Sequence, residues 1–397
     1  MAFSDTIEKI EALLADAKKL ERDDSLGARM QLVRQIDGLY RDLEPPINLF
    51  FRQWISLTVF TCMDIVVKLG IFERMKDHET VTAQQLGALV DVDAAVIARV
   101  MRVLVAAGIV ASTADDTYAH TPRSLLYVKG DKTAVDSFAL LTLLNVSYVP
   151  LPDYLKTRPA KDLVDVRKSP YACAYGMEGK TFYEVLSANP DHLATFNKSM
   201  SEPGPDYGLF PFASLQDEVE TEPDRPFMVD IGGGKGQALR FVQNAVEGVF
   251  KTPPKLILQD RSDVLEEIRP EDLAGIETMP YDFYAEQPVK GAHIYYLCQI
   301  LHNYPDHLCQ TILKRVAEAM SRSSRLLIVD AVLPAQTEIG GDMAGYLIDF
   351  VGLAIGGKER TEKEITALLD AEGLDLVKVW GGTTSYQSVV EARLKNL

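Results

Sequence analysis

The chain has 397 residues, more than one ordinary domain, and this length predicts two domains. Its formal net charge is −16, and a chain this acidic repels phosphate backbones and anionic lipid surfaces. We therefore expect neither nucleic acid nor a membrane as a partner. The four cysteines are widely spaced, with no CxxC pair and no nearby histidine ligands, so we expect reduced thiols, no disulfide framework and no bound metal.

The N-terminal segment predicts a cytoplasmic protein. Residues 1–20 are charged and amphipathic and lack the apolar core of a secretory signal. The chain has no uninterrupted apolar run of about 18 residues, so we expect no membrane-spanning helix.

Apolar residues at helical spacing predict helices over residues 5–21 and 28–42. Residues 50–72 form a longer, apolar and aromatic stretch, which Arg52 and Asp64 interrupt. Two interpretations remain open for this stretch: a helix buried against a partner subunit, or a core helix within one subunit.

Residues 83–90 and 93–108 predict two helices, and residues 109–121 predict two short strands around an Asp-Asp turn. Helix, helix and hairpin form a winged-helix pattern. Residues 72–125 hold five Lys or Arg and seven Asp or Glu, so this module is poorly suited to bind DNA. We interpret it as an assembly module. Residues 126–200 are predicted to be helices and loops.

From Phe227 onward the pattern changes to alternating strands and helices, which predicts an α/β, doubly wound and mostly parallel sheet of Rossmann type. Within this region we expect residues 293–301 to form one strand. The predicted organisation is a helical and winged-helix domain over residues 1–125, a helical linker over 126–210, and an α/β domain over 211–397.

The strongest local motif is VDIGGGKG, residues 229–236, where a strand ends and a helix begins. Its glycines allow a ligand to approach the backbone closely. Gln237 stands where a dinucleotide fingerprint needs a third glycine, so the motif does not predict pyrophosphate binding. Asp230 immediately before the turn is suited to meet a cationic amino group.

Two further acidic positions follow strands. Asp260 ends the next strand, where a carboxylate can accept both hydroxyls of a ribose. Asp282 and Phe283 suit the amino group and ring face of adenine. Each alone is also compatible with an ordinary surface position.

Taken in order, the runs VDIGGGKG, LQD, YDF, LHNYPD, LLIVDAVLP and GGKERTEKEI resemble the small-molecule O-methyltransferases of plants and fungi. The resemblance covers about residues 25–397. It implies S-adenosyl-L-methionine as cofactor, an N-terminal winged-helix dimerisation domain, a homodimer, and methylation of a phenol or enol on a small, largely apolar secondary metabolite.

The resemblance also implies roles for individual residues. His302 would be the general base, because the unperturbed pKa of histidine lies close to working pH. Asp330 and Glu359 would orient it. The residues implied to bind the cofactor are Asp230, Gly232, Gly234, Asp260, Asp282 and Phe283. Those implied to line the substrate pocket are Phe196, Met200, Tyr183, Met343 and Phe350, each of which plain core packing would also explain.

Two departures from the family pattern keep a second enzyme class open. Asn303 stands where many relatives have Asp, and Cys298 stands where plant members often have Lys. The alternative is a methyltransferase-like pericyclase or dehydratase of fungal natural-product biosynthesis, which binds S-adenosylmethionine as a fixed positive charge and transfers no methyl group. A non-catalytic regulator built on the winged helix is a third class, which the acidic charge disfavours.

Overall fold

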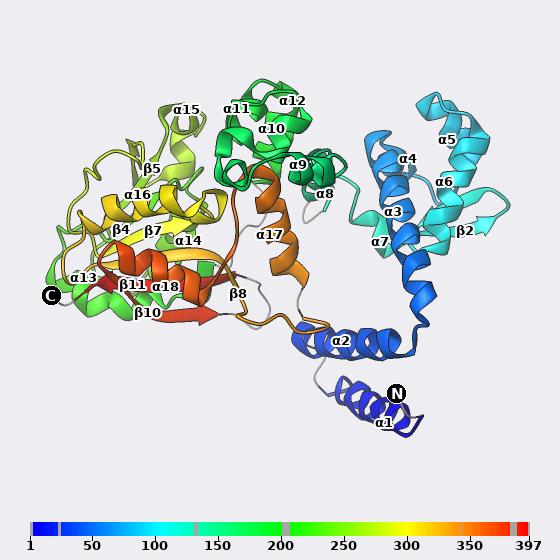
Figure 1. Ribbon diagram of the computed structural model, residues 1–397, viewed down its shortest axis with the longest axis horizontal. Coiled ribbons are helices and arrows are strands. Elements are labelled where there is room, and N and C mark those ends of the chain that lie inside the picture. Colours follow the sequence, from blue (N-terminus) through cyan, green and yellow to red (C-terminus); the bar gives the residue numbers. More distant parts are fainter. Residues whose placement is uncertain are drawn as a thin grey trace. The chain divides into compact units, whose positions relative to one another are not determined.

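The computed structural model describes residues 3–22, 25–130, 134–200, 207–341, 343–381 and 387–395. The chain divides into two compact units (Figure 1): Met1–Asn145 with Asn189–Pro203, and Val146–Ala188 with Gly204–Leu397. The predicted linker over residues 126–210 is thus shared between the two units. We call them the N-terminal unit and the C-terminal unit and describe each by itself.

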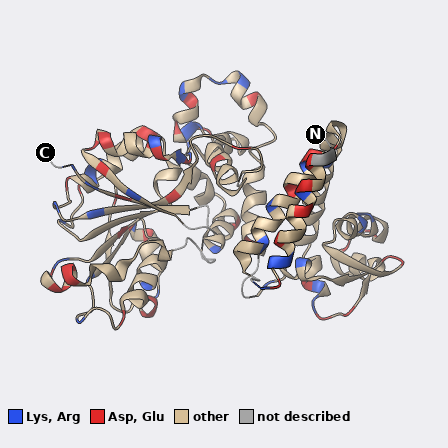
Figure 2. Cartoon of the chain, turned by 90° about the horizontal axis from the view of Figure 1, so that it is seen from below, with Lys and Arg blue, Asp and Glu red and all other residues tan. Residues whose placement is uncertain are grey.

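The N-terminal unit is mainly helical. Its helices are α1 (Phe3–Lys19), α2 (Leu26–Leu43), α3 (Pro46–Lys68), α4 (Ile71–Met75), α5 (Ala83–Val90), α6 (Ala94–Ala106), α7 (Pro122–Leu125), α8 (Val135–Asn145) and α12 (Pro190–Ser199). Its three strands are β1 (Val81–Thr82), β2 (Val110–Ala114) and β3 (Thr117–His120), in the order β1-β3-β2. Acidic and basic residues are interspersed along its helices (Figure 2), and Lys9 of α1 pairs with Asp42 of α2.

Local sequence explains the winged helix within this unit. Thr82 caps α5 through a capping box with Gln85, and Gly108, at φ +69°, ends the turn after α6. The β2–β3 hairpin follows, as the sequence predicts, with Asp116 at φ +44° in its turn.

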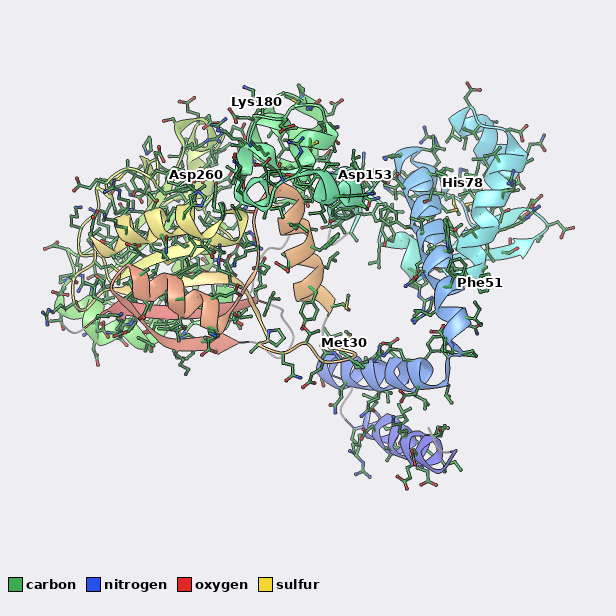
Figure 3. All side chains as sticks on the ribbon, in the orientation of Figure 1. Met30, Phe51, His78, Asp153, Lys180 and Asp260 are labelled. Carbon is green, nitrogen blue, oxygen red and sulfur yellow. The ribbon has the colours of Figure 1, made fainter. Side chains whose placement is uncertain are left out.

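Helix α3 exposes large apolar side chains, including Phe51 (Figure 3) and Trp54, at 56% and 58% exposure. Among the described residues it is the one helix long and apolar enough to cross a membrane by length and composition, a property the sequence analysis did not expect. The same composition suits a helix that packs against a second protein chain.

Within the residues that the structure describes, the C-terminal unit holds one eight-stranded sheet. Its strands are β4 (Met228–Ile231), β5 (Leu256–Asp260), β6 (Ile276–Pro280), β7 (Ile294–Cys298), β8 (Arg325–Leu333), β9 (Arg360–Thr361), β10 (Leu374–Gly381) and β11 (Gln387–Leu394). The order is β10-β11-β8-β7-β4-β5-β6, and β9 pairs with the end of β8. Strands β6, β5, β4, β7 and β8 are parallel, and β11 is antiparallel to both of its neighbours. This is the predicted Rossmann-like, mostly parallel sheet.

Helices cover both faces of this sheet. The helices of the unit are α9 (Leu151–Thr157), α10 (Pro170–Ala174), α11 (Phe182–Ser187), α13 (Gln216–Thr221), α14 (Gln237–Val246), α15 (Ser262–Leu265), α16 (Asp306–Ala317), α17 (Met343–Ile355) and α18 (Glu362–Ala371). Its 3₁₀ turns are η1 (Ala160–Val164), η2 (Val166–Lys168), η3 (Tyr207–Leu209), η4 (Phe212–Leu215), η5 (Pro270–Leu273) and η6 (Leu301–Asn303). Neighbouring residues of β4 point to opposite faces: Val229 packs in a core with α16 and α18, and Met228 in a core with α14 and η4.

One predicted strand ends earlier than expected. Residues 293–301 were expected to form one strand, but β7 ends at Cys298. Gln299 then adopts φ +55°, which turns the chain out of the extended conformation, and His302 lies on the short turn η6. A left-handed non-glycine residue is uncommon and concentrates at functional sites.

Candidate active site

His302 and Glu359 meet at the edge of the sheet where the parallel strands end. Nδ1 of His302, on η6, lies 2.7 Å from Oε1 of Glu359, which directly precedes β9. Their side chains are 17% and 2% exposed. Since a carboxylate only accepts, we assign the proton to Nδ1, which leaves Nε2 as the basic nitrogen of the ring.

Asp330 is the third group predicted to lie here, and it stands near the end of β8. It is buried, and among the described residues its Oδ1 has no hydrogen-bond partner. Burial raises the pKa of Asp330 to about 7. Burial alone would lower the pKa of His302, but the hydrogen bond with Glu359 and the charge of Asp330 raise that pKa above its ordinary value. The structure therefore places all three residues in one electrostatic cluster.

Two further residues of this cluster, Asp349 and Arg360, were not predicted from the sequence. The Oδ1 of Asp349, on α17, accepts a hydrogen bond of 2.9 Å from the backbone N–H of Glu359. Arg360 is 4% exposed and its guanidinium bonds to the turn that carries His302. Asp349 lies in no recognisable motif. Arg360 directly follows Glu359 in the GGKERT run, so this charged pair could have indicated it.

The glycine motif forms a tight turn between β4 and α14. Gly232, Gly234 and Gly236 have φ of +71°, +56° and +74°, where side chains are disfavoured. The N–H groups of Gly232 and Gly233 donate to the carbonyl of Gln259. A Cβ on Gly233 would collide with the carboxylate of Asp230, so the turn leaves no room for a side chain at that position.

The acidic residues beside this turn fit a cationic cofactor. Asp230 is fully buried, and neither of its carboxylate oxygens has a partner among the described residues. Burial, and then the charge of Asp260, raise the pKa of Asp230 to about 7. Asp260 (Figure 3) accepts a hydrogen bond of 2.9 Å from the N–H of Gly234 and so ties the end of β5 to the glycine turn. A buried, unpaired carboxylate is costly unless a cation meets it.

The predicted adenine residues lie after β6. Oδ1 of Asp282 accepts from the N–H of Tyr284 at 3.0 Å. The ring of Phe283 packs edge-on against Tyr284 and against Tyr304, with centroids 4.9 and 5.7 Å apart. Since Tyr304 directly follows η6, this aromatic cluster joins the predicted adenine loop to the turn that carries His302.

Two buried glutamines support the same region. The amide groups of Gln259 and Gln287 exchange two hydrogen bonds of 2.8 Å and both side chains are fully buried. They link the end of β5 to the loop that follows the adenine residues. Nothing in the sequence pattern marks this pair.

The residues predicted to line the substrate pocket are spread over three helices. Tyr183, on α11, interacts electrostatically with Asp260, and burial raises the pKa of Tyr183 to about 12. Phe350, on α17, is partly exposed with its ring 5.2 Å from that of Tyr148, and Met343 at the start of α17 is 71% exposed. Phe196 and Met200 lie on and just after α12, in the N-terminal unit. Tyr183 thus interacts with Asp260, the predicted ribose residue, and its place in the substrate pocket stays a prediction.

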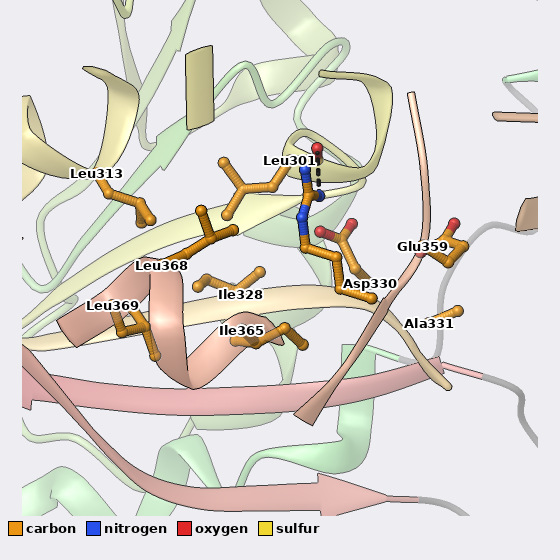
Figure 4. A pocket seen from close by; sticks show the side chains of 10 residues that line it. Leu301, Leu313, Ile328, Asp330, Ala331, Glu359, Ile365, Leu368 and Leu369 are labelled. Carbon is orange, nitrogen blue, oxygen red and sulfur yellow. Dashed lines mark hydrogen bonds between the residues drawn. The ribbon is translucent and has the colours of Figure 1, made fainter. Parts of the chain in front are cut away.

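A small cavity lies behind the acidic residues (Figure 4). Its volume is about 10 Å³, and Leu301, Asp330, Glu359 and Arg360 are among the residues that line it. It has room for about one water molecule, so an acceptor molecule has to approach His302 from another side. The described part of the chain holds no group of His, Cys, Asp and Glu suited to a metal ion.

The Rossmann-like sheet, with its glycine turn, unpaired acid and acid–histidine cluster at one sheet edge, is the architecture of a cofactor-binding α/β enzyme. Residues 158–375 match the model of the O-methyltransferase domain, and residues 54–130 that of the O-methyltransferase dimerisation domain. The chain belongs to the O-methyltransferase family and is an S-adenosylmethionine-dependent enzyme of that family.

Individual relatives agree with this assignment. The chain is 66% identical to the O-methyltransferase hmp5 of Hypomyces subiculosus over 389 residues, 98% of both chains. Among solved structures, OxaC in complex with SAH and oxaline has a TM-score of 0.85 at 29% identity, over 98% of this chain and 99% of that one. A structure titled a pericyclic reaction enzyme has a TM-score of 0.83 at 25% identity, over 98% of this chain and 100% of that one.

Proposed function

We propose that this enzyme methylates a phenolic or enolic hydroxyl of a small, largely apolar secondary metabolite, with His302 as general base. The observation that carries the proposal is the bond between His302 Nδ1 and Glu359 Oε1. It fixes the ring and its tautomer, and it leaves Nε2 to accept a proton.

Each residue of the cluster has a separate task in this proposal. S-adenosylmethionine, when bound, supplies a methyl group made electrophilic by the sulfonium. Nε2 of His302 would take the hydroxyl proton as the acceptor oxygen bonds to the methyl carbon and the carbon–sulfur bond breaks, with the sulfur leaving as a neutral thioether. Glu359 and Asp330 stabilise the imidazolium that results, because their negative charges lie in a buried environment.

Residues at the ends of β4, β5 and β6 are proposed to hold the cofactor. Asp230 would meet the amino group, Asp260 the ribose hydroxyls, and Asp282 with Phe283 the adenine. The glycine turn supports this assignment, because its backbone approaches the ligand position without side chains. For the acceptor, we propose an apolar wall within the C-terminal unit that includes Phe350, Met343 and Tyr183.

The substitution His302→Ala tests the base. We expect it to lower methyl transfer to catechols, resorcinols or enolic diketones by about 10²–10⁴-fold, the usual contribution of a general base. His307, exposed on α16 in the same segment, offers a matched control, and His307→Ala should retain turnover. Undiminished turnover in His302→Ala would reject the assignment of the base.

The similarity of this fold to that of a pericyclic reaction enzyme supports a second candidate function, in which the bound cofactor transfers no methyl group. The identity of 66% to an O-methyltransferase favours transfer. Product mass separates the two: a gain of one CH₂ accompanies methylation, whereas rearrangement leaves the mass unchanged and dehydration lowers it by one water.

We further propose that the enzyme is a cytoplasmic homodimer. The matched dimerisation domain and the exposed apolar face of α3 support the dimer. Four free cysteines support a reducing compartment.

A further inference from the structure

We propose that Arg360 is a positioning residue that holds the His302 turn against Glu359. The inference rests on the proposed function, in which His302 is the base. Glu359 contacts the ring of His302 directly, whereas Arg360, the first residue of β9, binds the backbone and neighbours of that turn.

The guanidinium of Arg360 donates hydrogen bonds to backbone carbonyls before and after His302. Its Nη1 donates to the carbonyl of Leu301 at 2.9 Å, and its Nη2 donates to the carbonyl of Tyr304 at 2.7 Å. Between these two contacts, the backbone N–H of Lys358 donates to the carbonyl of His302 at 2.9 Å. The segment that carries Glu359 therefore binds three carbonyls of the segment that carries the base.

A carboxylate completes the attachment. Nε and Nη2 of Arg360 donate to Oδ1 of Asp306 at 3.0 and 2.9 Å, and Nη2 also contacts the sulfur of Cys309. Asp306 begins α16, so Arg360 fixes the turn and the helix that follows it as one body. Five N–H groups in a rigid plane make this possible, and an ammonium group cannot reproduce the geometry.

The strand pairing sets where Arg360 stands. Arg360 pairs with Val332 of β8, two residues after Asp330, so β8 positions one acid of the cluster and, through β9, the other acid and the guanidinium. Arg360 and Asp330 both line the small cavity, in which Figure 4 labels Asp330, Glu359 and Leu301. Loosening this attachment should separate His302 from Glu359, and a shift of about 1 Å is enough to cost roughly 10²-fold in rate.

The test compares Arg360→Lys with Arg325→Lys. Arg325 is a matched control, because it is also buried and forms two hydrogen bonds of 2.7 Å with Glu218, but it begins β8 at the opposite edge of the sheet. We expect Arg360→Lys to lower kcat about 10- to 100-fold with an unchanged affinity for SAH, and Arg325→Lys to leave kcat unaltered. Both variants should lose similar thermal stability.

A spectroscopic measurement makes the result independent of turnover. The chain has six histidines, so NMR of labelled imidazoles can follow His302, assigned through His302→Ala. Arg360→Lys should lower the pKa of His302, because the contact with Glu359 raises it, and Arg325→Lys should not. The ascending limb of the rate against pH should shift in the same direction.

The outcomes separate this inference from the function on which it rests. If Arg360→Lys keeps both the kcat and the His302 titration of the parent enzyme, the positioning role is wrong. If His302→Ala keeps turnover, the assignment of the base fails, while the titration still decides whether Arg360 positions the ring. If Arg360→Lys does not fold, Asp306→Ala, which removes the acceptor of two guanidinium hydrogen bonds at a half-exposed side chain, replaces it in both measurements.

Discussion

Gly357 packs so closely against the turn of His302 that a Cβ on Gly357 would lie 2.1 Å from the carbonyl oxygen of His302 and would also overlap the backbone of Asn303. We expect Gly357→Ala to push the His302 turn away and to destabilise the protein by about 1–3 kcal/mol, the usual cost of overpacking. Methyl transfer should fall with it. Gly27, in α2, has open space where its Cβ would lie, so Gly27→Ala is the control for the substitution itself. The measurements are kcat and Tm of both variants. Equal values for Gly357→Ala and Gly27→Ala would contradict the prediction.

The acid beside the base should set the pH dependence. A base works as neutral imidazole, so kcat/KM should rise with pH through the raised pKa of His302. Glu359→Gln removes the hydrogen-bonded charge, so the rising limb should move to lower pH while the maximal rate falls about 10²-fold. A pH–rate profile measured from pH 5 to 9 checks both effects, and an unshifted limb would show that Glu359 does not set the pKa of His302.

In the cofactor-free protein, ionisation of the buried Asp230 should lower the free energy of unfolding. In the folded protein burial raises the pKa of Asp230 to about 7, from the ordinary aspartate value of 3.8. The folded state therefore binds more protons between these values, and the stability present below pH 4 is lost as the pH rises through 7. Asp230→Asn removes the charge, so above pH 7 it should raise the Tm of the cofactor-free protein, by about 2–4 °C for each kcal/mol gained.

The same variant should bind S-adenosylmethionine weakly, because the amino group loses its anion. Calorimetric titration of parent and variant, with thermal melts at pH 5 and 8, checks both effects. A variant that loses stability at pH 8 and binds as tightly as the parent would show that Asp230 already has a partner in the folded protein.

Helix α3 should carry the dimer. Trp54 and Ile55 are 58% and 61% exposed, and such apolar surface is typical of an interface between chains. Trp54→Glu combined with Ile55→Glu should convert a dimer into monomers in sedimentation at micromolar concentration. Lys68→Glu at the polar end of α3 should leave the dimer intact. A parent chain that sediments as a monomer would refute the proposed assembly.

Much of the fold was predictable because it depends on local patterns. Alternating strands and helices indicated the Rossmann-like sheet, and a capping threonine with a helix-ending glycine marked the winged helix. The end of β7 was not predictable, because residues 293–301 are uniformly suited to a strand and the chain leaves it only where Gln299 turns left-handed. Helix α17 was not predicted, because its own residues are apolar on nearly every face and therefore show no clear helical period of hydrophobicity.

The sequence by itself determined which chemical groups stand at the strand ends: a carboxylate before the glycine turn, one after the next strand, and a histidine after β7. Only the tertiary structure decided that Glu359, 57 residues from His302, lies 2.7 Å from its ring, and that Arg360 and Asp349 fix both. The physical reason is that strand pairing and helix packing bring distant segments together, and no periodicity within either segment encodes that meeting. Burial then set the protonation of the acids, and burial belongs to the fold rather than to the residue.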